Sequence, residues 1–243
     1  MKIAVWFSCG AASAVALKLT VDKYGVENVR AVNNPVKEEH SDNLRFLKDV
    51  SDWVGIEIEQ VKNKNFPGAS VVEVFNKRKG MSFPMGAPCT VELKKRARQQ
   101  WEAENPVDYH VLGFTLDEKR RHERFILTER NNVLPILIDA NMTKDDCFRF
   151  LASAGIKLPK IYEHGFPNAN CIGCVKATSP TYWNLVRREF PEVFEERSQQ
   201  SRKLGSKLVR VKSERIFLDE LDPNAKGRPM KTMPDCGIFC EEE

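Results

Sequence analysis

The sequence predicts an α/β fold: a Rossmann-like parallel sheet of about five strands with helices on both faces, plus a helical and irregular C-terminal extension that bears cysteines. Two observations support this class. Short apolar runs alternate with helix-length segments as far as residue 61, as in parallel sheets whose strands are joined by helices. Near residue 156 the composition changes, and prolines and glycines then surround a Cys-x-x-Cys motif. We therefore predict two domains, residues 1–155 and residues 156–243.

The predicted strands are short and mostly apolar, and cover residues 3–7, 29–33, 56–61, 108–113 and 133–137. The first strand is followed by a turn of small residues and then by a good helix-forming segment at 14–19. This order of strand, turn and helix is typical of the start of a nucleotide-binding α/β unit. Further helices are predicted at 42–54, 70–79, 91–104 and 117–129. Another starts at Thr143, with Asp146 in a capping-box position. In the extension, Pro191 separates helices at 182–190 and 192–204.

Bulk composition excludes little. The chain has 243 residues, of which 42% are hydrophobic, and carries 38 basic against 34 acidic side chains. This balance does not indicate nucleic acid by itself, and an anionic small molecule fits as well. No apolar run approaches the roughly 20 residues of a membrane span, and Met1–Phe7 lacks the long apolar region of a signal peptide. We expect a cytoplasmic protein with no membrane partner, in which clustered cysteines bind metal or do redox chemistry.

A candidate phosphate loop lies between the first strand and the first helix. Its members are Ser8, Gly10, Ala11 and Ser13. Small residues let backbone N–H groups approach phosphate or sulfate oxygens, and the helix N-terminus adds partial positive charge. The spacing and lysine of a Walker loop are absent, so a simple tight turn remains the alternative.

The cysteines form the second constellation. Five of the seven are candidates for a metal site: Cys89, Cys171, Cys174, Cys236 and Cys240. Four soft ligands would close a zinc site, for which the pairs 171/174 and 236/240 are the natural choice. Three or four thiolates would hold an iron–sulfur cluster instead. The alternative for any cysteine is that it packs in the core as a small apolar side chain. This interpretation is most favoured for the two remaining cysteines, for Cys147 first and then for Cys9.

Several segments, in order, resemble those of the PAPS and APS reductases and their PP-loop relatives, the adenine nucleotide alpha-hydrolase-like superfamily. They are Ser8–Ser13, Asn33–Phe46, Pro88–Lys94, Gly113–Arg120 and Tyr162–Cys174. In APS reductases a 4Fe–4S cluster is held by a cysteine pair and, at a separation like the 82 positions between Cys89 and Cys171, by Cys-x-x-Cys. The closing Asp235–Ile238 resembles the segment that carries the reductases' nucleophilic thiol.

The resemblance implies an oxidoreductase that reduces an adenylyl-sulfate to sulfite and an adenosine phosphate. Cys236 would be the nucleophile, and Cys89, Cys171, Cys174 and Cys240 the ligands of a 4Fe–4S cluster, with zinc as the alternative metal. Ser8, Gly10, Ala11 and Ser13 would bind phosphate or sulfate. The remaining nucleotide-binding candidates are Asn33, Gly113 and Phe114 near the base, and Lys94 and Arg120 as neutralising charges. A thioredoxin-like thiol would supply electrons.

Three departures from the family pattern keep alternatives open. Pro88 stands where cluster-bearing reductases have a first cysteine, Ala12 where relatives carry an acid, and Phe239 where a reductase tail usually has histidine. One alternative is PP-loop, ATP-dependent sulfur insertion into tRNA or DNA, with the basic runs 94–98 and 119–124 facing nucleic acid. Another is a zinc-clamped, non-catalytic nucleotide-binding module. The choice among APS, PAPS and ATP stays open, and a homo-oligomer is compatible with the sequence.

Overall fold

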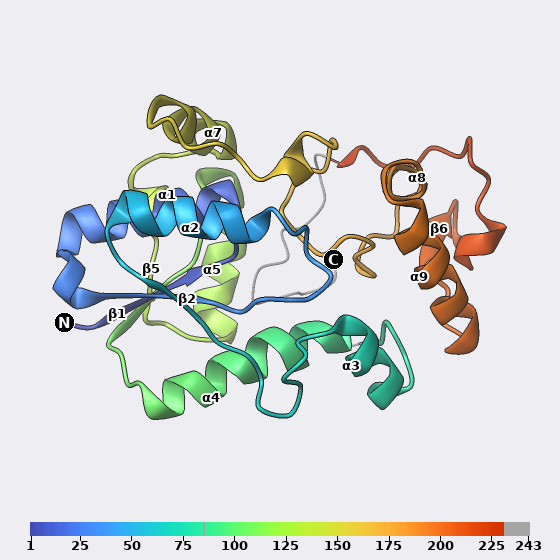
Figure 1. The fold of residues 1–243 in the computed structure, drawn as a ribbon, viewed down its shortest axis with the longest axis horizontal. Coiled ribbons are helices and arrows are strands. Elements are labelled where there is room, and N and C mark those ends of the chain that lie inside the picture. Colours follow the sequence, from blue (N-terminus) through green and yellow to red (C-terminus); the bar gives the residue numbers. More distant parts are fainter. Residues whose placement is uncertain (85, 231–243) are drawn as a thin grey trace. The chain divides into compact units, whose positions relative to one another are not determined.

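A computed structural model describes residues 1–84 and 86–230 (Figure 1). Its contacts divide the chain into two compact units that are interleaved in sequence. The first unit comprises residues 1–35, 41–61 and 98–160, and the second comprises 36–40, 62–97 and the chain from 161 onward. The predicted boundary at residue 155 stays a prediction. The units follow contacts instead, so two segments that precede residue 98 group with the cysteine-bearing extension.

The first unit contains a five-stranded, all-parallel sheet, so the predicted α/β class is confirmed. Its strands are β1 (Ile3–Phe7), β2 (Val29–Asn33), β3 (Ile58–Gln60), β4 (Tyr109–Val111) and β5 (Val133–Leu134). The spatial order is β3-β2-β1-β4-β5, with β1 in the centre. The chain therefore builds the sheet outward in both directions from β1. This reversal creates a switch point beside β1, where α/β sheets bind their ligands.

Helices surround this sheet: α1 (Ala11–Tyr24), α2 (Asn43–Val54), α4 (Ala97–Glu104), α5 (Lys119–Thr128), α6 (Ile136–Asp139) and α7 (Lys144–Ser153). Short 3₁₀ turns cover Val26–Asn28 and Leu116–Glu118. All five residues of β1 are buried, so alternate side chains enter two different cores. Phe7 packs on Phe46 of α2, whereas Trp6 points the other way, to Trp101 of α4. Helices therefore cover both faces of the sheet.

The second unit is mainly helical. It contains α3 (Val71–Arg78), a π-helix (Thr90–Arg96), α8 (Pro180–Glu189), α9 (Pro191–Lys203) and a hairpin of β6 (Val209–Val211) and β7 (Glu214–Ile216). Short 3₁₀ turns cover Lys160–Tyr162 and Leu218–Glu220. A separate hydrophobic core holds the unit together, with Phe75, Trp183 and Leu208 among its fully buried members. This core is the frame on which the cysteines are placed.

Three local expectations needed correction. The predicted helix at 91–104 is a π-helix followed by α4, and the first begins one residue earlier, at Thr90. The predicted strand at 133–137 stops at Leu134, and α6 begins two residues later. The β6–β7 hairpin was missed, since its strands are only three residues each.

The Thr143 capping box is confirmed: Asp146 N donates to Thr143 Oγ1 at 3.2 Å. Within the described ranges, no helix is long and apolar enough to cross a membrane.

A buried histidine lies beneath the sheet on the side of α4. Trp6 Nε1 donates to His110 Nδ1 at 3.1 Å, so this nitrogen is an acceptor and the imidazole is neutral. His110 is only 4% exposed. Burial is the main cause that lowers the pKa of His110 to about 4, and the nearby Arg130 charge adds to it. The charged form is thus excluded from the fold at neutral pH.

This histidine predicts a pH dependence of stability. The pKa of His110 is about 4 in the folded protein and near 6.5 when unfolded. Above pH 6.5 both states are neutral; as the pH falls toward 4, only the unfolded chain takes the proton, so about 3 kcal/mol is lost. Urea denaturation at pH 7 and pH 4.5 measures this. In His110→Gln the difference between the two pH values should shrink, and an unchanged difference would contradict the assignment.

Candidate functional site

The predicted phosphate loop links β1 to α1, and one hydroxyl holds it together. Ser13 Oγ accepts from Ser8 N at 3.1 Å and from Ser8 Oγ at 3.2 Å, and donates to Gly10 O at 2.9 Å. Gly10 is the N-cap of α1, and Cys9 adopts a left-handed backbone conformation with φ of 57°. Ala11 is the first helical residue. The four predicted loop residues therefore form one compact turn at the carboxyl end of β1.

The electrostatics of this turn suit an anion. The 14-residue helix α1 starts here and has no acidic side chain in its first turn. The free N–H groups of a helix N-terminus attract negative charge. The turn also follows the central strand, beside the point where strand order reverses. A phosphate or sulfate would meet the backbone donors of this turn.

Asn33 shapes the loop from the neighbouring strand. It ends β2, opposite Phe7 in the register, and is 3% exposed. Its Nδ2 donates to Phe7 O at 2.8 Å and to Cys9 Sγ at 3.7 Å. Since both amide hydrogens are engaged inside the protein, the side chain tethers the loop. The prediction that Asn33 lies near a base stays untested, and the role visible here is structural.

Gly113 is required by close approach of backbones. It follows β4, and a Cβ atom at this position would lie 2.9 Å from Ser13 N and 3.1 Å from the carbonyl carbon of Ala12. The next residue, Phe114, is buried and packs its ring 5.7 Å from Phe125 of α5. Its amide donates to Leu112 O, so this N–H is also engaged. Arg120 is exposed on α5, and its predicted charge role stays a prediction.

Substituting Gly113 tests this close approach. Gly113→Ala would push a methyl group into the first turn of α1, and we expect a loss of about 1–3 kcal/mol in the free energy of unfolding. Gly68→Ala is the matched control, because its Cβ would meet only the end of the flexible Glu73 side chain. Chemical denaturation compares the two. Equal free energies of unfolding for the two variants would show that the start of α1 shifts to accommodate the methyl group without loss of stability.

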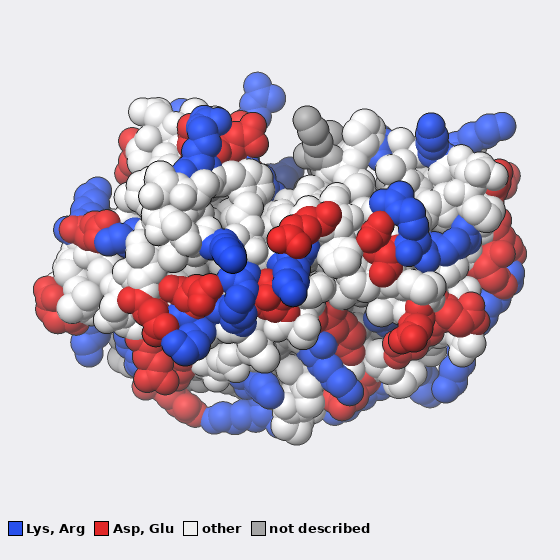
Figure 2. All heavy atoms as spheres, turned by 45° about the horizontal axis from the view of Figure 1, so that its top comes forward, with Lys and Arg blue, Asp and Glu red and all other residues white. Residues whose placement is uncertain are grey.

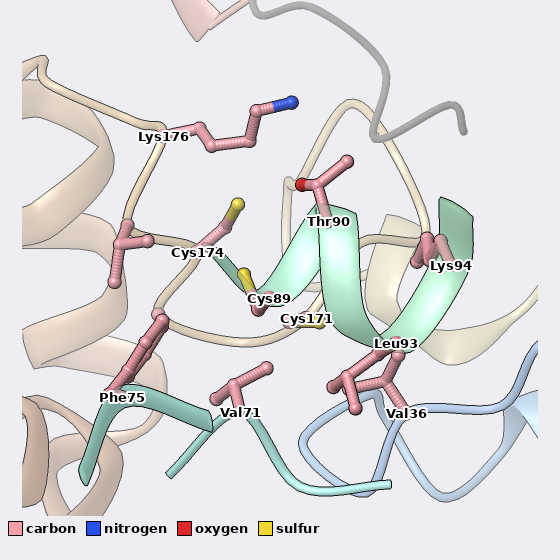
Figure 3. Close-up of a pocket in the computed structure, with 12 residues that line it drawn as sticks. Val36, Val71, Phe75, Cys89, Thr90, Leu93, Lys94, Cys171, Cys174 and Lys176 are labelled. Atoms are coloured by element: carbon pink, nitrogen blue, oxygen red, sulfur yellow. The ribbon is translucent and has the colours of Figure 1, made fainter. Parts of the chain in front are cut away.

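Three of the predicted metal ligands line one pocket of the second unit (Figure 3). Cys171 and Cys174 are buried, and Cys89 is half-buried. The rest of the lining is mostly apolar and consists of Val36, Val71, Phe75, Thr90, Leu93, Lys94, Gly173, Val175 and Lys176. The other two candidates, Cys236 and Cys240, lie outside the described residues. The pocket thus joins a residue before the π-helix with a turn some 82 positions later.

The Cys171–Cys174 turn is held by a buried tyrosine. Tyr182 Oη accepts from Cys174 N at 2.7 Å and donates to Cys171 O at 3.4 Å. Burial raises the pKa of Tyr182 well above its ordinary value, and the neighbouring cysteines act in the same direction. Gly173 provides the left-handed residue of the turn, with φ of 69°. Its neighbour Ile172 donates its N–H to Glu38 O at 2.9 Å.

The π-helix that follows Cys89 is anchored by a buried carboxylate. Glu92 is 1% exposed and accepts from Arg78 Nε at 2.8 Å and from Arg96 Nη1 at 2.9 Å. Its backbone oxygen accepts from Asn63 Nδ2 at 2.7 Å. Lys94, on the same helix, is 8% exposed and lies 3.5 Å from Glu39. Lys94 therefore belongs to the cysteine pocket, where Glu39 already balances part of its charge.

The donor set of this pocket fits an iron–sulfur cluster. Its lining holds thiols but no carboxylate or imidazole, and soft thiolates in an apolar shell are the usual ligands of such clusters. Within residues 1–84 and 86–230, no group of three His, Cys, Asp or Glu side chains could hold a single metal ion. An iron–sulfur cluster needs a different arrangement, because each thiolate binds a separate iron atom of the cluster. The zinc alternative depends on Cys236 and Cys240, which are outside that range.

Removing one hydroxyl tests how the Cys171–Cys174 turn is held. In Tyr182→Phe the buried N–H of Cys174 loses its acceptor, which should cost about 1–3 kcal/mol of folding free energy. Tyr109→Phe is the control, because Tyr109 is 38% exposed at the surface. Thermal denaturation of the metal-free proteins gives the comparison. Should both variants melt like the parent, the hydroxyl would not be what positions the turn.

The sequence matches the profile of the phosphoadenosine phosphosulfate reductase domain over residues 2–180. The chain belongs to this family. The match includes the phosphate loop, Cys89 and the Cys171–Cys174 turn, and it ends at the start of α8. The resemblance deduced from short motifs is thereby confirmed.

Two solved structures are similar to this chain, and the first of them shares its fold. The phosphoadenylyl-sulfate (PAPS) reductase from Candida auris, in its phosphate complex, aligns with a TM-score of 0.50 at 11% identity, covering 70% of this chain and 81% of that one. The U34-tRNA thiolase NcsA from Methanococcus maripaludis, solved with its [4Fe-4S] cluster, aligns with a TM-score of 0.47 at 12% identity, covering 84% and 72%. A search of curated proteins found no match.

Sequence reasoning missed the residues that support the site. Tyr182, Glu92 and Arg197 had no motif to mark them, since each acts through contacts with residues distant in sequence. A signal did exist for Glu92, a lone acid in a basic run. None existed for the tyrosine, which could equally be an ordinary core residue of an amphipathic helix.

Proposed function

We propose that the protein reduces an adenylyl-sulfate to sulfite and an adenosine phosphate, with a 4Fe–4S cluster in its second unit. One observation carries the proposal: in a member of the PAPS reductase family, Cys89 and a Cys-x-x-Cys turn 82 positions later line one apolar pocket. Thiols gathered in an apolar pocket are the usual ligands of an iron–sulfur cluster.

The nucleotide is proposed to bind the first unit. The backbone N–H groups at the start of α1 would receive its sulfate or phosphate, in a turn that the hydrogen bonds of Ser8 and Ser13 hold together. Asn33 and Gly113 act as positioning residues, because one tethers the loop and the other lets β4 approach it. Phe114 is proposed to lie near the base. Lys94 and Arg120 remain candidates for neutralising the anion.

The cluster is proposed to be held by Cys89, Cys171 and Cys174. Pro88 precedes Cys89, so the fourth ligand must come from elsewhere, and Cys240 is our candidate. When bound, the cluster would order the site and tune its electrostatics. Tyr182 and Gly173 orient the Cys171–Cys174 turn, while Glu92 keeps the π-helix after Cys89 in place.

The chemical step is proposed for Cys236, which lies outside the described residues. Its thiolate attacks the sulfur of the adenylyl-sulfate, an S–S bond forms, the S–O bond to the nucleotide breaks, and AMP or its 3′-phosphate leaves. A thioredoxin-like dithiol then attacks Cys236 sulfur and releases sulfite. The dithiol supplies two electrons and ends as a disulfide, so Cys236 returns to the thiol.

Metal analysis tests the ligand assignment. After anaerobic purification, Cys89→Ser, Cys171→Ser and Cys174→Ser should each lose most of the bound iron and the broad visible absorbance of the parent. Cys147→Ala should keep both, because burial in α7 raises the pKa of Cys147 to about 12 and holds it as an inert thiol. A colourless parent with stoichiometric zinc would instead support the zinc-clamped module.

Sulfite release from APS and PAPS tests the activity. The parent should release sulfite in the presence of a dithiol donor, and Cys236→Ser should release none. Turnover unchanged in the variant would remove Cys236 as the nucleophile. Iron without any sulfite from either substrate would remove the reductase proposal and leave the cluster proposal standing.

A second candidate is ATP-dependent sulfur insertion into tRNA or DNA. It is favoured by the residue before Cys89, since Pro88 leaves a three-cysteine set in which one iron would stay open. The face in Figure 2 mixes lysine and arginine with aspartate and glutamate, a surface without the single-sign field that nucleic acid prefers. Nucleic-acid binding that weakens steeply with salt, together with no sulfite release, would favour this candidate over the first.

A further inference from the structure

A buried arginine lies beside the cysteine pocket. Arg197 of α9 is only 1% exposed and is among the largest fully buried side chains. Its Nη1 donates to Gln200 Oε1 at 2.5 Å, and its guanidinium lies 5.6 Å from the centre of the Phe75 ring. Across the described part of the chain, no carboxylate lies within ion-pair distance of Arg197, and its buried Nε has no hydrogen-bond partner.

The guanidinium lies against the wall of the pocket. A Cβ atom on Gly173, between the two cysteines of the turn, would come within 3.6 Å of Arg197 Nε. Phe75, over which the guanidinium lies, also lines the pocket.

Burying this charge is unfavourable unless something compensates it. An arginine stays protonated in proteins, so it cannot escape the cost of burial by losing its proton. Neither a glutamine oxygen nor an aromatic ring provides a full negative charge. The thiols in the pocket do so once metal is bound, since each ligand cysteine is then a thiolate and a cysteine-ligated 4Fe–4S cluster is net negative.

We propose that Arg197 is the internal counter-charge of the cluster, a positioning residue that stabilises the loaded pocket and raises the reduction potential of the cluster. This inference rests on the cluster of the proposed function. Lys94 is a weaker counter-charge, because Glu39 lies 3.5 Å from its ammonium. The site therefore carries its compensating cation on α9, beyond the residues that match the family profile.

The role predicts opposite effects with and without metal. In the metal-free protein no cluster charge faces the guanidinium, so Arg197→Met removes a buried charge that has no carboxylate partner among the described residues, and it should raise the melting temperature. In the reconstituted protein the same change should reduce the iron retained after chelator challenge several-fold and move the midpoint potential of the cluster to a more negative value. Arg197→Lys keeps the charge and should stay close to the parent in potential.

Arg187→Met is the matched control. Arg187 lies 4.3 Å from the Phe194 ring, and its guanidinium donates to Leu221 O at 2.9 Å, so its role is to support packing. Its loss should lower the melting temperature with and without metal and leave the potential unchanged. The same behaviour in Arg197→Met would overturn our inference and leave the cluster proposal intact. A parent that takes up no iron on reconstitution would overturn both.

Discussion

The Tyr182 hydroxyl is the contact on which the cysteine pocket depends. It accepts the Cys174 N–H and donates to the Cys171 carbonyl, so it satisfies the backbone of a turn that is buried away from water. A buried turn without such a partner would leave a backbone donor unpaired, and the chain would not keep the two sulfurs in a fixed direction. Because Tyr182 is on α8, the turn is placed by the helical core of the second unit and not by its own short sequence.

The two candidate sites differ in the electrostatic environment that each would provide for negative charge. Under the proposed function, the phosphate loop would receive an anion from water with backbone N–H groups and no acidic side chain in the first turn of α1. The cysteine pocket would hold negative sulfurs in an apolar shell, where charge is costly unless it is balanced. A buried guanidinium next to that shell is the kind of group that would lower the free-energy cost of these buried negative charges.

Small residues recur wherever the first unit needs backbones to meet. Gly113 touches the first turn of α1, and Asn33 reaches across from β2 to the same loop. These contacts impose the shape of the loop from both neighbouring strands.

The sequence by itself determined the fold class, the strands near their observed places, the Thr143 capping box and the family, because these are encoded in periodicity and in motifs of neighbouring residues. Tertiary structure decided what distant residues do together. It grouped the segment 62–97 with the C-terminal extension, lined one pocket with Cys89 and the Cys171–Cys174 turn, and buried Arg197 beside it. The physical reason is that burial and pairing arise between elements far apart in sequence, where no local pattern records them.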